Sequence, residues 1–129
     1  MSDKINSARD YAYIGSVSHY IGNLDDALEN YISALSLDAE INDQINMIRD
    51  CVCIGLLRYE MGSQYDALAL LFEAKRLLED YTDNADYRDA LNEEIDIIIF
   101  QLQKQNGLKW SKLLEIADKL YWSVNQAIP

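Results

Sequence analysis

Two arginines and one histidine are the first side chains in this sequence whose types could support binding or chemistry. Arg9 and Arg49 lie forty positions apart, and two guanidinium groups could together grip a partner carboxylate. Pairing with acidic neighbours on their own helices is the alternative. His19 is the only histidine, and one imidazole needs thiolate or carboxylate help to hold zinc. The sequence therefore predicts no metal site and no cofactor.

Cys51 and Cys53 are the only cysteines, and they lie two positions apart. On a helix this spacing points them to different faces, so we expect no disulfide between them and interpret them as small core residues. Two free thiols fit a reducing cytoplasm. The first ten residues lack the apolar stretch of a secretory signal, which also predicts a cytoplasmic protein.

Catalytic motifs are missing from the sequence. It contains no nucleophile elbow, no glycine-rich phosphate loop and no HExxH pattern. The acidic run 80–86 lacks the central glycine and distal glutamate of a calcium loop, so we interpret it as a solvated connection before a helix. We therefore expect a protein that is not an enzyme.

The charge of the chain is strongly acidic and uneven. Its 129 residues include 11 basic and 22 acidic side chains, a formal net charge of −11, which disfavours nucleic acid and anionic membranes as partners. No apolar run approaches the ~20 residues needed to span a bilayer, and residues 97–100 are far too short. Residues 1–100 carry a net charge of −13 and residues 101–129 a net charge of +2. A basic protein partner is one interpretation of this charge, and solubility alone is the other.

The elements that must position these side chains are helices. Hydrophobic residues make up 50% of the chain, which has five glycines and a single proline at position 129, so an all-α domain is predicted. Residues 8–37 align without a gap with residues 48–77 and share ten identities. Each copy reads as two helices, separated by Gly22 in the first and Gly62 in the second, with Asn23 and Ser63 as expected caps.

Glycine also recurs inside the first helix of each copy, at Gly15 and Gly55. A mid-helix glycine costs about 1 kcal/mol relative to alanine. Because glycine occurs at this position in both copies despite its cost, we predict a close approach between helices there. We expect Ala27 and Ala67 to be the small residues that face the two glycines.

This spacing of small residues resembles the tetratricopeptide repeat (TPR). The resemblance rests on Gly15, Gly22, Ala27 and Ala34, and again on the residues forty positions later. The period of forty is longer than the usual ~34 residues, closer to long-helix TPR variants, and it overlaps the HEAT and armadillo range. The resemblance implies a right-handed α-α superhelix of about three antiparallel helix pairs.

A third, degenerate unit follows the two clear copies. A cap at Asp83 or Asn84 predicts a helix from about residue 85 to 105, and Asn106-Gly107 predicts its end. A last helix is expected over residues 108–126. We also expect helix A of the second unit to extend backward through residues 42–47. The chain then forms one domain, residues 1–129, with units at about 5–38, 39–80 and 84–126.

The first helix of each TPR unit usually lines the concave face of the array, so the resemblance implies a partner-binding groove. Nine tyrosines are available to supply contact area. The groove residues expected by alignment are Arg9, Tyr13, Ser16, His19, Tyr20, Arg49, Cys53, Leu56, Tyr59, Ile97, Gln101 and Lys104.

The function expected from this groove is protein–protein interaction, as an adaptor or small chaperone that binds a peptide or helix of a partner. The alternative is a structural or homo-oligomeric protein whose groove is filled by its own termini or by a second copy. A homodimer is a further possible partner state, with Trp110 and Trp122 as the expected oligomer contacts.

Overall fold

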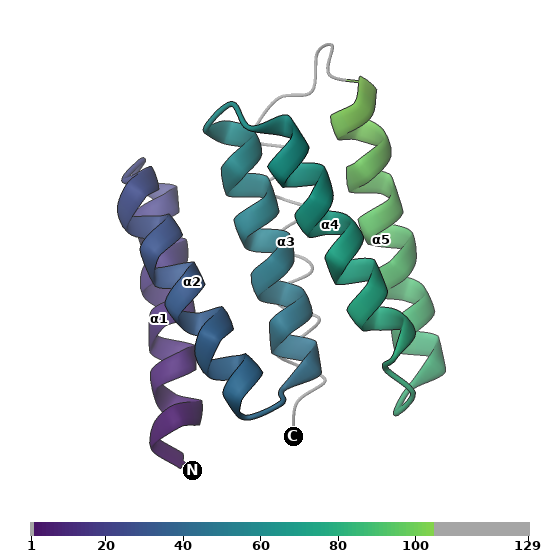
Figure 1. The fold of residues 1–129 in the computed structure, drawn as a ribbon, viewed down its shortest axis with the longest axis horizontal. Coiled ribbons are helices and arrows are strands. Elements are labelled where there is room, and N and C mark those ends of the chain that lie inside the picture. The colour runs from purple at the N-terminus through teal and green to yellow at the C-terminus, as the bar shows by residue number, and fades with distance from the viewer. Residues whose placement is uncertain (1, 105–129) are drawn as a thin grey trace.

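The structure is a computed structural model that describes residues 2–104, and all of its regular elements are α-helices. Figure 1 shows α1 (Ser2–Tyr20), α2 (Leu24–Glu40), α3 (Gln44–Glu60), α4 (Gln64–Glu79) and α5 (Ala85–Lys104). The prediction of an all-α fold is confirmed for this part of the chain. The helix predicted over residues 108–126 lies outside the described residues.

The first three connections between helices share one type of tight turn, repeated every twenty residues. In each turn an amide donates a hydrogen bond to the carbonyl five residues earlier: Asn23 to Ser18 (2.8 Å), Asp43 to Asp38 (2.9 Å) and Ser63 to Arg58 (2.8 Å). The residue before each donor has a positive φ, at Gly22 (88°), Asn42 (56°) and Gly62 (90°). These left-handed residues reverse the chain and satisfy the last carbonyls of the preceding helix.

The helix caps only partly follow the sequence-based expectation. The side chains of Asn23 and Ser63 make no capping hydrogen bond; the Ser63 hydroxyl instead donates to Asp66. Asn84 does cap α5, because its Oδ1 accepts from the Tyr87 amide at 3.0 Å. α3 begins at Gln44 with Asp43 as its cap, so the extension through residues 42–47 is wrong at its start.

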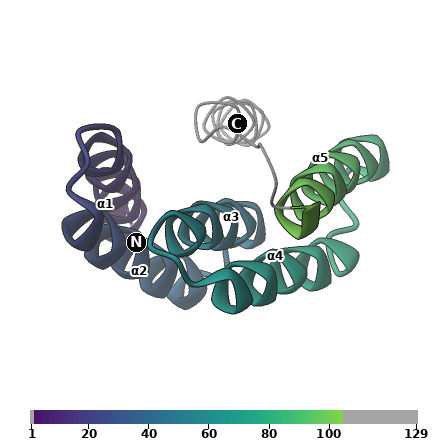
Figure 2. The same ribbon diagram turned by 90° about the horizontal axis from the view of Figure 1, so that it is seen from above.

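The helices form two curved layers. Figure 2 shows α1, α3 and α5 along the inner side of an arc, with α2 and α4 behind them on the outer side. Buried, half-buried and exposed positions follow the same order in residues 24–40 and in residues 64–80. The two outer helices therefore use the same faces for packing.

The mid-helix glycines make room for different neighbours. A Cβ on Gly55 would lie 3.2 Å from the carbonyl oxygen of Ala67, which agrees with the expected close approach to that alanine. A Cβ on Gly15 would instead lie 2.7 Å from the ring of Tyr31, so the nearest neighbour of Gly15 is Tyr31 and not the expected Ala27. Tyr31 occupies the register of Leu71, and its larger ring fills the space that glycine leaves.

The core extends from α2 to α5. One cluster joins α3, α4 and α5, and a second joins Ala27 and Tyr31 of α2 to Ile54 and Leu57 of α3. Within residues 2–104 we find no helix that combines the length and the apolar character needed to cross a bilayer.

Candidate functional site

Of the residues predicted to line a groove, three on α1 are exposed. Tyr13 and Tyr20, seven residues apart, are 65% and 84% exposed. Arg9 is also exposed. Ser16 is half-buried, and its hydroxyl accepts a hydrogen bond from the Tyr31 hydroxyl at 3.3 Å. Three of these side chains can therefore meet a partner directly, whereas Ser16 takes part in the packing of α1 on α2.

The exposed surface of α1 is also unusually apolar. Ile14, Val17 and Ile21 are exposed beside the two tyrosines. Ile14 and Val17 stand forty positions before Ile54 and Leu57, which pack against α2. α1 thus presents the same kind of face as α3, but the described residues hold no preceding helix to cover it. The sequence-based set missed these three residues, although the match of Ile14 and Val17 to Ile54 and Leu57 was readable from the repeat.

Arg49 is buried rather than available to a partner, which corrects its predicted role. Its side chain is 3% exposed. The guanidinium donates to Asp50 Oδ1 from Nη2 at 2.7 Å and lies 3.4 Å from Asp38 Oδ2. The alternative of pairing with an acidic neighbour is confirmed for Asp50, and Asp38 of α2 adds a contact between helices. Arg9 and Arg49 therefore cannot act as a pair on one ligand.

The cluster of Asp38, Arg49 and Asp50 holds two carboxyl groups against one guanidinium. Burial raises the pKa of Asp50 well above its ordinary value of 3.8, and a hydrogen bond with Asp38 raises it further. Burial also raises the pKa of Asp38, while the hydrogen bond from Asp50 and the charge of Arg49 oppose that rise. With one guanidinium for two carboxyl groups, the raised pKa of Asp50 favours the protonated form of that carboxyl.

The other predicted groove residues of α3 are covered to different extents. Leu56 is 1% exposed and belongs to the core, so its predicted role as a contact is wrong. Cys53 and Tyr59 are half-buried. Cys51 is buried, and burial raises the pKa of its thiol to about 12, which leaves it unreactive near neutral pH.

His19 is buried and joins α1 to α3. Its Nε2 lies 2.7 Å from Glu60 Oε2, and its ring meets that of Tyr31 edge-on. His19 is 8% exposed, so the structure does not support its predicted role as a groove contact. Residues 2–104 contain no group of three or more side chains that could hold a metal ion.

The predicted residues of α5 differ in exposure. Ile97 is exposed, and Lys104 is exposed with its ammonium 4.5 Å from the centre of the Phe100 ring. Gln101 is half-buried, with its Oε1 out of contact with solvent. The predicted oligomer contacts Trp110 and Trp122 lie outside the described residues.

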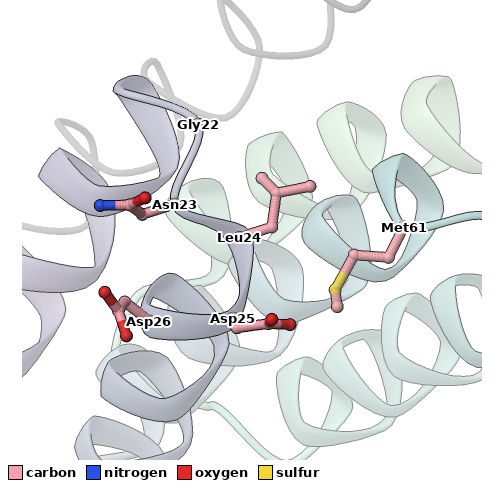
Figure 3. A pocket seen from close by; sticks show the side chains of 6 residues that line it. All are labelled: Gly22, Asn23, Leu24, Asp25, Asp26 and Met61. Atoms are coloured by element: carbon pink, nitrogen blue, oxygen red, sulfur yellow. The ribbon is translucent and has the colours of Figure 1, made fainter.

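An open depression of about 600 Å³ lies at the start of α2. Figure 3 shows Leu24 and Asp25 on the side toward Met61, with Asn23 and Asp26 on the other side. The two carboxylates lie in the first turn of α2, where they complement the positive end of the helix dipole and oppose a bound anion. The geometry therefore gives no support to a phosphate site here.

Comparison of the sequence with protein-family models and with curated proteins, and of the fold with solved structures, gives no significant match. The assignment of a function therefore rests on the residues and contacts of this chain.

Proposed function

We propose that this chain is a TPR-like protein-interaction module that binds a helix or extended segment of a partner protein along α1. The single observation that supports this proposal best is the exposure of Tyr13 and Tyr20 beside an apolar stripe on one helix. Contiguous exposed apolar surface marks interaction sites, and tyrosine adds contact area with a polar hydroxyl. The role as an adaptor or small chaperone, in the cytoplasm, belongs to this proposal.

The contacts available on α1 favour a particular kind of partner. Tyr13, Tyr20 and the apolar stripe suit the apolar face of a helix, while the net charge of −13 on residues 1–100 favours basic residues beside that face. Arg9 lies on the same helix and could pair with one partner carboxylate. Neither nucleic acid nor an anionic membrane suits this surface.

The test compares a double tyrosine variant with a single tyrosine variant in the intact chain. Affinity capture from native lysate uses the wild type, the Tyr13→Ser/Tyr20→Ser variant and a control with Tyr65→Ser, because Tyr65 is 90% exposed on the outer helix α4. We expect the first variant to lose the partners that the wild type and the control retain. Unchanged partners in all three samples would refute the proposed surface.

Self-association is a second candidate, favoured by one observation. Ile14 and Val17 occupy the register of Ile54 and Leu57, which are the residues that α3 uses to pack on α2. A second copy could therefore cover the same stripe of α1. Sedimentation equilibrium of the wild type and Val17→Asp separates the candidates: a dimer that Val17→Asp dissociates supports self-association, and a monomer at all concentrations supports a different partner.

A further inference from the structure

The contacts of α3 define which of its sides faces the outer layer. Ile54 and Leu57 pack in the cluster with α2, and Gly55 approaches the Ala67 backbone of α4. An α-helix turns 100° per residue, so these residues span the half of α3 that is turned toward α2 and α4. The opposite half is the inner face of α3, which carries Ile45, Arg49, Val52 and Leu56.

The inner face of α3 is buried. Arg49 contacts Asp38 of α2, and Ile45, Val52 and Leu56 belong to the cluster that also holds residues of α4 and α5. Val52 and Leu56 are 2% and 1% exposed, and Ile45 and Arg49 are also buried. Figures 1 and 2 show α1 on one side of α3 and α5 on the other, with α2 and α4 behind. Two of the four matching positions of α1 differ, because Ile5 and Arg9 are exposed, whereas Ala12 is buried and Ser16 is half-buried. The inner face of α3 therefore has the character of a covered surface.

We propose that residues 108–126 of the same chain bind along the inner face of α3. This segment begins four residues after α5 ends at Lys104. Its apolar residues recur at helical spacing, at Trp110, Leu113, Leu114, Ala117, Leu120, Tyr121 and Val124. Nineteen helical residues span ~28 Å, close to the ~26 Å of the seventeen-residue α3. A single helix of this kind can therefore cover the whole inner face.

Charge also favours this occupant. Residues 101–129 carry a net charge of +2, whereas residues 1–100 carry −13. Opposite net charges draw the segment toward the acidic array, and apolar burial holds it there. The segment would shield α3 while α1 keeps its exposed tyrosines, so this inference goes beyond the proposed function and needs no partner.

Two probes in the natural chain report on this contact. Trp110 and Trp122 are the only tryptophans, so tryptophan emission reports on this segment alone. Cys53 is half-buried: it packs beside the cluster of α2 and α3 and, one residue after Val52, lies at the edge of the inner face. The thiol of Cys51 is buried, with its pKa raised to about 12. The rate of reaction with a thiol reagent at neutral pH therefore reports mainly on the accessibility of Cys53.

The experiment uses Leu113→Asp/Leu120→Asp in the full chain, with Ser111→Asp/Gln126→Asp as the control on the polar side of the same segment. We expect the leucine variant to increase the Cys53 reaction rate about tenfold or more and to shift tryptophan emission toward that of a solvated indole. Circular dichroism should show that α1–α5 stay folded. The control should resemble the wild type.

Two results would overturn the inference. The first is an unchanged Cys53 rate and unchanged tryptophan emission in the leucine variant. The second is protection of Cys53 in the wild type that disappears on dilution, because that result would place the segment of a second copy on α3. If the leucine variant unfolds, seen as loss of the far-ultraviolet helical signal, the milder variant Leu120→Ser replaces it. We expect a smaller increase in the Cys53 reaction rate for this variant. An unchanged rate refutes the contact.

Discussion

The hairpins α1–α2 and α3–α4 share a sequence pattern but meet different surroundings. Arg9, Asp10 and Ile14 have counterparts in Arg49, Asp50 and Ile54, and the outer helices of both hairpins use the same buried positions. In the second hairpin these residues are buried against α2, whereas in the first they are exposed. The same side chains therefore serve as core in one hairpin and as accessible surface in the other, and neighbours decide which.

The strongest test of this difference between the hairpins places an aspartate at the same repeat position in each. Leu57 is fully buried and Val17 is 43% exposed at the matching position. Leu57→Asp should cost more than about 4 kcal/mol, because an unpaired carboxylate enters the core, and Val17→Asp at most about 0.5 kcal/mol. Urea denaturation followed by circular dichroism measures both. Equal losses would mean that the α1 face is covered in the isolated chain.

The two arginines provide the next comparison. Arg49→Met removes the guanidinium from two buried carboxyl groups and should destabilise the fold by about 3–5 kcal/mol. Arg9→Met, on the exposed side of α1, should cost less than about 1 kcal/mol. Thermal and urea midpoints of the two variants give the difference. A cost at Arg49 no larger than at Arg9 would contradict the buried cluster.

The two mid-helix glycines test whether helix packing also differs between the two hairpins. Gly15→Ala places a methyl group 2.7 Å from the ring of buried Tyr31, so the ring must shift, and we expect a loss of about 1–3 kcal/mol. Gly55→Ala meets the Ala67 carbonyl at 3.2 Å, and the helix propensity of alanine offsets part of that strain. We expect a loss below about 1 kcal/mol there. Urea midpoints that reverse this order would show that the Tyr31 ring yields easily.

The smallest expected effect is a dependence on pH. Because the folded-state pKa of Asp50 is raised, the folded state binds more protons than the unfolded state once the pH exceeds the ordinary value of 3.8. The stabilisation is complete below that value and is lost as the pH rises through the folded-state pKa. Asp50→Asn should therefore flatten the decline in the free energy of unfolding above pH ~4. Parallel slopes for the wild type and Asp50→Asn would contradict the raised pKa of Asp50.

Repetition in the sequence predicted much of the fold. Gly22 and Gly62 identified two of the turns, and the stretch from 85 to 105 predicted α5 almost to the residue. The turn at Asn42 was missed because asparagine replaces glycine there, so the twenty-residue spacing of the turns went unseen.

The burial of Arg49 could not be predicted from its alignment with Arg9, because the same position in two repeats can face different neighbouring helices. One signal was present: Asp38 stands where α4 has the core residue Leu78. An acid at a core position calls for a cationic partner on an adjacent helix. The exposed tyrosines of α1 were predicted by alignment, but their accessibility depends on which helices surround them.

Hydroxyl-radical footprinting of tyrosines tests the account most directly, with the full chain alone and in complex with a captured partner. We predict that Tyr13, Tyr20 and Tyr65 react readily in the free chain, and that partner binding protects Tyr13 and Tyr20 while Tyr65 stays reactive. Protection of Tyr65 with continued reactivity of Tyr13 and Tyr20 would contradict the proposal that α1 carries the binding surface.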